Sequence, residues 1–84
     1  MKLILVEWID SHAGRGWQDI ERIENAAVPL SCKSVGWLIA ENKLCKVIVP
    51  HISGLDKNRG TIHQGCGDLV IPKRAIIKTT ILHV

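Results

Sequence analysis

The chain has 84 residues, of which 46% are hydrophobic, and its formal net charge at pH 7 is +3. A chain of this length forms one domain, residues 1–84, and buries a smaller share of its surface than a larger protein does, so its margin of stability is thin. The apolar content is high for so short a chain, which predicts a homo-oligomer in which another subunit covers part of the surface.

No apolar run approaches the roughly 18 to 20 residues that a membrane-spanning helix needs, and the apolar start of the chain lacks the pattern of a cleavable signal peptide. We therefore expect a soluble, cytoplasmic protein with no membrane partner. Cys32, Cys45 and Cys66 are odd in number and form no C-x-x-C pair. This spacing predicts free thiols in a reducing compartment.

Charge is distributed unevenly along the chain. Residues 1–42 carry four basic and six acidic side chains, net −2, whereas residues 43–84 carry seven basic and two acidic ones, net +5. A basic half suits an anionic partner, whether a nucleotide-derived small molecule, a nucleic acid or an acidic protein, although scattered lysines also serve solubility.

The first half of the chain predicts one strand followed by a long loop. Residues 2–9 form a strand that opens with apolar side chains on both faces, as in a central strand, and Trp8 is assigned to the core. Residues 10–29 form the loop, with room for a short helix over residues 18–25 that carries Ile20 and Ile23 on one side.

The second half predicts four more strands. Residues 35–40 and 47–49 form a hairpin around a polar turn at residues 41–43, and Trp37, which shares a face with Ile39, is assigned to the core. Residues 52–68 read as a long polar connection. A short strand at 69–71, a single turn at 72–75 and a closing strand at 76–84 complete an all-β, five-stranded SH3-like barrel. A Sm-like variant fits the same pattern, and an OB-fold is the main alternative.

Two loops carry the side chains that suit a binding site. In the first loop, His12, Arg15 and Trp17 are the types that clamp a planar anionic ligand, with stacking by the indole and ion pairing by the guanidinium. An equally weighted alternative is that Trp17 folds back over the open end of the barrel.

The second loop is richest between residues 59 and 68. Arg59 and His63 can meet phosphate, Gln64 can read an amide or a base edge, and Gly65 and Gly67 permit close backbone approach. With His51, which begins this connection, the predicted ligand-binding residues are His12, Arg15, Trp17, His51, Arg59, His63, Gln64, Gly65 and Gly67.

Catalytic, metal and cofactor roles find little support in the residues. His63 and Cys66 offer only two ligands where a structural zinc site needs four. The segment is neither a Walker loop nor a dinucleotide fingerprint. A hydrolase with His51 or His63 as its base would lack paired carboxylates or a coherent nucleophile. We therefore expect no enzyme, no catalytic residue, no bound metal and no cofactor.

Four motifs carry a resemblance that extends over nearly the whole chain: V-x-W-x-D-S before G-W (residues 6–17), S-V-G-W-L-x-x-E (34–41), V-P-H (49–51) and Q-G-C-G-D-x-x-I-P (64–72). They resemble a family of small proteins encoded by bacteriophages and prophages. The resemblance implies a phage origin and a place in the cytoplasm of the bacterial host.

Small phage proteins that bind and hide nucleotide-derived signals of bacterial immunity are similar to this chain in size and chemistry. The functional hypothesis is therefore a non-catalytic protein that sequesters such an anionic signal between its two loops. The alternative is an SH3-like or Sm-like module that binds a host protein or single-stranded nucleic acid through the same loops.

Overall fold

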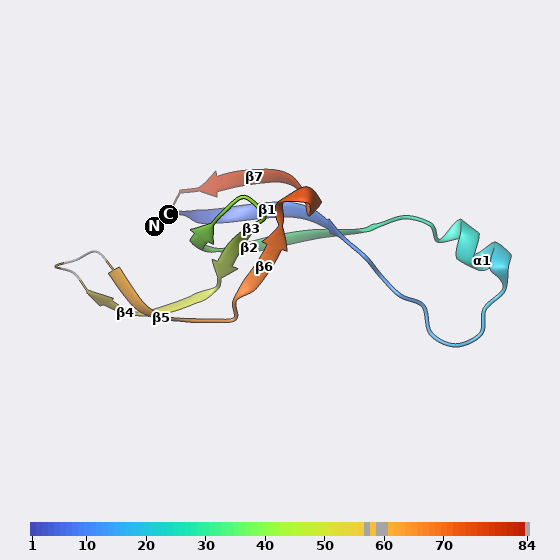
Figure 1. Ribbon diagram of the computed structural model, residues 1–84, viewed down its shortest axis with the longest axis horizontal. Helices are drawn as coiled ribbons and strands as arrows, with labels where there is room; N and C mark the ends of the chain where they lie inside the picture. The colour runs from blue at the N-terminus through green and yellow to red at the C-terminus, as the bar shows by residue number, and fades with distance from the viewer. Residues whose placement is uncertain (57, 59–60, 84) are drawn as a thin grey trace.

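The computed structural model describes residues 1–56, 58 and 61–83. It is built mainly from antiparallel strands, with one short helix and one turn of 3₁₀ helix in the described residues (Figure 1). The elements are β1 (Leu3–Asp10), α1 (Ile20–Asn25), β2 (Leu30–Glu41), β3 (Cys45–Val49), β4 (His51–Asp56), β5 (Thr61–Cys66), β6 (Leu69–Pro72), η1 (Lys73–Ala75) and β7 (Ile76–Leu82).

The body of the molecule is a five-stranded sheet of order β6-β3-β2-β1-β7. These are the five strands that the sequence predicts, and the short helix and the one-turn helix also lie where they were expected. The all-β assignment is confirmed. β1 is an interior strand of the sheet, as its two apolar faces indicate, because it pairs with β2 on one side and with β7 on the other.

One face of the sheet holds the core. Ile4 and Val6 of β1, Ile48 of β3 and Ile71 of β6 form a buried apolar cluster. Trp8 packs against this cluster, and its indole Nε1 donates a hydrogen bond of 3.0 Å to the hydroxyl of Ser34 on β2. The prediction that Trp8 belongs to the core is therefore confirmed, and its side chain remains partly exposed.

The other face of the sheet, here called the outer face, is also apolar. Trp37 pairs with Leu3 across β1 and β2 and shares its face with Val35 and Ile39, which are 51% and 45% exposed. The assignment of Trp37 to the core is therefore wrong: the side chain is half-buried on the opposite face. Alternation along β2 places it correctly beside Ile39, but alternation alone does not say which face is inner.

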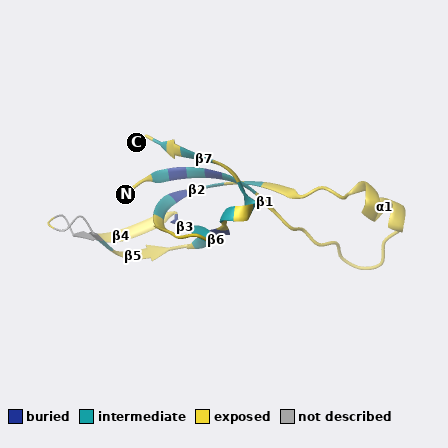
Figure 2. Cartoon of the chain, turned by 45° about the horizontal axis from the view of Figure 1, so that its top comes forward, coloured by how far each residue is buried: buried dark blue, intermediate teal, exposed yellow. Residues whose placement is uncertain are grey.

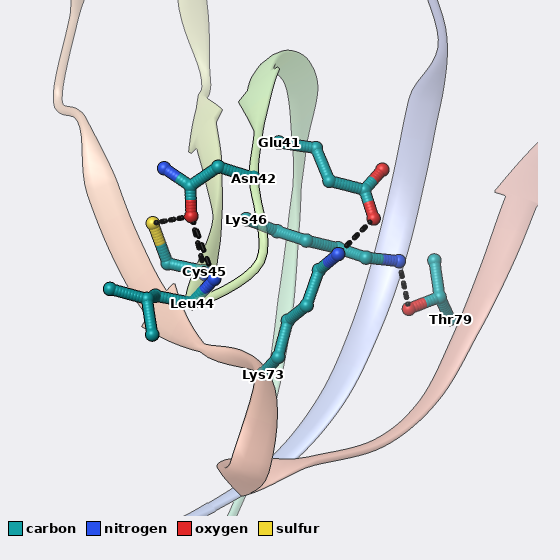
Figure 3. A network of polar contacts seen from close by, with 7 residues as sticks. All are labelled: Glu41, Asn42, Leu44, Cys45, Lys46, Lys73 and Thr79. Atoms are coloured by element: carbon teal, nitrogen blue, oxygen red, sulfur yellow. Dashed lines mark hydrogen bonds and ion pairs between the residues drawn. The ribbon is translucent and has the colours of Figure 1, made fainter.

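The sheet curls without closing. Lys46 on β3 donates a hydrogen bond of 3.0 Å from Nζ to the hydroxyl of Thr79 on β7, although β2 and β1 lie between these two strands (Figure 3). Among the described residues no ladder joins β6 to β7, so the predicted closure into a barrel is not found.

Polar contacts fix the turn between β2 and β3. The side-chain oxygen of Asn42 accepts hydrogen bonds from the backbone N–H of Leu44 at 2.8 Å and of Cys45 at 3.0 Å (Figure 3). Next to it, Lys73 of η1 forms an ion pair of 2.9 Å with Glu41. The turn predicted around Asn42 is confirmed. The ion pair between Glu41 and Lys73 connects the end of β2 to the start of η1.

The predicted polar connection at residues 52–68 is wrong. The chain there forms a second antiparallel ladder, β4 with β5, which projects from the body as a hairpin (Figure 1). Glycines and polar residues lower β propensity, and for this reason the sequence pattern reads as a loop. Lys57 and Arg59 lie outside the described residues.

A second projection leaves the opposite end of the body. Residues 10–30, here called the arm, run out from β1, form α1 and return to β2 (Figure 1). Every residue from 9 to 31 is exposed (Figure 2). The two projections make the molecule 60 Å long but only 25 by 24 Å across.

Cys32, Cys45 and Cys66 are free thiols, and the third is exposed. No helix in the described part of the chain has the length and apolar character needed to cross a membrane.

Candidate ligand-binding site

An open groove of about 500 Å³ lies along the β4–β5 hairpin. Four of the predicted site residues line it together: His51, His63, Gln64 and Gly65. We call this the hairpin groove, and its remaining lining residues are Ile52, Ser53 and Cys66. The sequence pattern predicts a loop here, but the side chains that it selects are brought together by the β4–β5 ladder.

Register explains how the hairpin gathers these groups. His51 pairs with Cys66, and Ser53 pairs with Gln64, so their four side chains share one face of the hairpin. On this face an imidazole, a hydroxyl and an amide offer hydrogen-bond donors. His63 also lines the groove, although it alternates to the opposite face of β5, and no acidic residue appears among the described residues that line the groove. Such a lining suits a ligand with acceptor oxygens, as an anion has.

Gly54 fixes the position of His63. Its φ is +72°, and a Cβ at this position would lie 3.1 Å from the Cβ of His63. Only glycine adopts this backbone conformation readily and leaves room for the imidazole across the ladder. Gly54 therefore lets His63 lie close against the backbone of the facing strand.

A second groove, of about 560 Å³, adjoins the first on the other side of β5. His63, Gln64 and Gly65 line both grooves. We call the second one the outer groove, because Ile39, Val47 and Val49 of the outer face of the sheet form its floor, and Met1, Ile62 and Asp68 complete its lining.

Gly67 lies at the base of the hairpin and outside both grooves. Its φ is +81°, and a Cβ there would lie 3.0 Å from Cγ of Pro50. Gly67 thus lets the chain turn from β5 to β6 closely past the proline that links β3 to β4. It shapes the base of the hairpin.

The predicted residues of the first loop lie on the arm. Nε2 of His12 donates a hydrogen bond of 2.6 Å to the carbonyl of Val28, which joins the outgoing and returning halves of the arm. His12 also lines a hollow of about 530 Å³ within the arm, together with residues such as Gln18 and Ile23. The imidazole of His12 therefore links the two halves of the arm and also lines this hollow.

Trp17 is fully exposed near the beginning of α1. It does not fold back over an end of the sheet, which excludes for this chain the alternative considered above. Arg15 lies beside it and accepts, through its backbone carbonyl, a hydrogen bond of 3.3 Å from the amide of Gln18.

The two predicted loops do not meet within one chain. The arm, with His12, Arg15 and Trp17, and the hairpin, with His51, His63, Gln64 and Gly65, lie at opposite ends of the long axis (Figure 1). Arg59 was predicted to pair phosphate beside them, and it lies outside the described residues. A ligand held by both loops would have to bridge two subunits.

Sequence reasoning missed Ser53, Gly54 and Cys66 as parts of the groove or of its geometry. The available signal was the placement of one apolar residue on each side of residues 57–60, because Leu55 and Ile62 lie at equal distances from the centre of that segment. Glycines in both halves obscured it.

No protein-family model matches this chain, and the searches of curated proteins and of solved structures also found no match.

Proposed function

We propose that the protein is a non-catalytic binding protein of a bacteriophage, and that it sequesters an anionic, nucleotide-derived signal of bacterial immunity in the host cytoplasm. The hairpin groove receives the ligand. Retention without turnover suffices for this role, since a bound signal molecule cannot reach its effector.

The observation that carries the proposal is the convergence of His51, Ser53, His63 and Gln64 on one groove of about 500 Å³. A volume of this size falls within the range of small-molecule sites. Donor groups on its wall complement phosphate and base acceptors, and the amide of Gln64 can both donate to and accept from a base edge.

A depletion assay tests this proposal. A deproteinised extract of phage-challenged, defence-active bacteria is incubated with the protein, the protein is removed, and signalling activity in the remaining extract is measured. Sequestration predicts that activity is lost, and that heating the recovered protein releases a molecule of unchanged mass. Gln64→Ala should leave the activity in solution, while Leu44→Glu, at an exposed turn remote from the groove, should deplete it as the wild type does. Release of a molecule of altered mass would instead identify an enzyme.

One observation favours a second candidate, an SH3-like or Sm-like module that binds a host protein or single-stranded nucleic acid. The order β6-β3-β2-β1-β7, with one turn of helix before β7, is the strand order of SH3-like barrels. Modules of this kind bind extended partners along their surface. Binding of a single-stranded oligonucleotide that weakens steeply with added salt would favour this candidate over a small ligand.

A further inference from the structure

In the described part of the chain, the body leaves every residue of the arm exposed. Trp17 is fully exposed, and Ile20 and Ile23, which lie three residues apart on one side of α1, are 68% and 51% exposed. No residue of α1 is buried. An isolated helix of six residues is unstable in water, because helices this short depend on tertiary packing of an apolar face. The arm therefore needs a surface to pack on.

The outer groove is a surface of matching character. Its floor is apolar, with Ile39 45% exposed beside Val47 and Val49. Its volume of about 560 Å³ has room for several apolar side chains. The body thus offers an apolar groove at one end and the arm offers an apolar helix face at the other.

The length of the molecule prevents the arm from reaching its own groove. The radius of gyration of the Cα atoms is 17.1 Å, whereas a compact chain of this length has a radius of about 12 Å. The arm and the hairpin that borders the groove project in opposite directions (Figure 1). A second copy of the chain carries the nearest complementary element.

Charge also favours a second copy as the occupant of the groove. The arm, residues 10–30, has four acidic and two basic side chains, net −2, and the rest of the chain has four acidic and nine basic ones, net +5. Packing of an arm on the body of another copy brings parts of opposite net charge together, while packing of arm on arm would bring parts of like net charge together.

We propose that two copies of the chain exchange arms, so that α1 of each packs into the outer groove of the other. The contact is reciprocal, as in a closed two-fold dimer in which each subunit offers the same two surfaces. His63, Gln64 and Gly65 line both grooves, so the partner's arm lies beside the hairpin groove. Arg15 and Trp17 of one subunit then complete the ligand site of the other. This last step rests on the proposed function, but the dimer does not.

Native mass spectrometry and sedimentation velocity over a range of concentrations test the dimer. The wild type should be a dimer. Ile20→Glu and Ile39→Glu should each raise the dissociation constant by more than about tenfold, because each places a charge in an apolar contact. Leu44→Glu is the matched control: Leu44 is 80% exposed but belongs to neither surface, so this variant should stay dimeric. A monomeric wild type, or an Ile20→Glu variant that dimerises as the wild type does, would overturn the proposal.

Mixing the two defective variants makes the test specific for exchange. Ile20→Glu retains an intact groove and Ile39→Glu retains an intact arm, so one of the two contacts re-forms in the mixture. One variant is labelled with ¹⁵N, so that the heterodimer has a mass between those of the two homodimers. This heterodimer should appear in the mixture. Its appearance also shows that both variants are folded. Its absence would contradict arm-to-groove packing.

The same samples separate the dimer from the ligand site. After incubation with the deproteinised bacterial extract, the wild-type dimer should retain an added mass and the Ile20→Glu monomer should lose it. A monomer that retains the mass as well as the dimer does would refute completion of the site by the partner's arm and leave the proposed function standing. A dimer without added mass would refute the proposed function and leave the exchange standing.

Discussion

Lys46 and Thr79 join two strands that are separated in the sheet by two others, through a hydrogen bond of 3.0 Å between the ammonium and the hydroxyl. Backbone ladders do not connect β6 to β7 in the described part of the chain. This side-chain contact therefore helps to hold the sheet in its curled form, with the apolar cluster inside the curve.

Replacement of Thr79 by valine removes the acceptor and keeps the size of the side chain. We expect Thr79→Val to lower the free energy of unfolding by about 1 kcal/mol, the typical net value of one hydrogen bond. Urea denaturation measures the change. Thr80→Val is the matched control, because Thr80 is also partly exposed but points to the outer face. An equal effect of the two substitutions would show that the contact with Lys46 does not stabilise the curl.

The two half-buried tryptophans of the sheet should differ in their contribution to stability. Trp8→Phe removes the donor to Ser34 and leaves a gap against the core, so we expect a loss of about 1–3 kcal/mol in the free energy of unfolding. Trp37→Phe, on the outer face, should cost less than this. Thermal unfolding of the two variants in parallel checks the order, and a larger loss for Trp37→Phe would mean that the core lies on the other face.

The contrast between Trp8 and Trp37 shows how far the sequence predicts this fold. The period of two residues correctly predicts which residues of the same strand share a face with each ring. Pro72 and Asn42 correctly mark a helical turn and a hairpin turn. Which face is inner depends on how the sheet curls, and that follows from contacts such as Lys46 with Thr79 across 33 residues of sequence. Local patterns do not contain this information.

The candidate site shows the same limit. Its residue types pointed to His51, His63, Gln64 and Gly65, and the structure brings these four together. The pattern could not show that the segment is a hairpin, because Gly54 and Gly65 weaken the strand signal. At Gly54 the lack of a Cβ is what the packing of His63 requires. The pattern also could not show that the arm and the β4–β5 hairpin project in opposite directions (Figure 1).

Gly54→Ala should disturb the site more than a comparable change elsewhere. At a φ of +72° an alanine is strained by about 1–2 kcal/mol, and here its Cβ would also approach His63. Gly16→Ala is the matched control, since its φ is +70° but no atom lies within 4 Å of the added Cβ. Chemical shifts of the His63 ring should move in Gly54→Ala and remain unchanged in Gly16→Ala. Unchanged shifts in both would show that Gly54 does not position this imidazole.

The ion pair between Glu41 and Lys73 predicts a dependence of stability on pH. The hydrogen bond from Lys73 holds the pKa of Glu41 below its ordinary value of 4.5, although desolvation opposes the shift, and the charges of Lys73, Lys46 and Lys2 also lower it. Because the folded state favours the ionised form, this contribution is present above pH 4.5 and is lost as the pH falls through the lower, folded value.

Glu41→Gln should therefore destabilise the protein slightly at neutral pH, and the difference between the two proteins should shrink towards about pH 2, as Glu41 takes up a proton. The carboxylate is exposed to solvent, so the effect is small. Urea midpoints of the wild type and the variant at both pH values provide the measurement. A difference that grows as the pH falls would have the wrong sign for this ion pair.

The most direct test of the central claim is native mass spectrometry of the protein purified from phage-challenged, defence-active bacteria, compared with Gln64→Ala purified in the same way. We predict a nucleotide-sized mass retained by the wild type and absent from Gln64→Ala, with both proteins folded alike by circular dichroism. A wild type that carries no added mass under gentle conditions, or a variant that retains the ligand fully, would contradict binding in the hairpin groove.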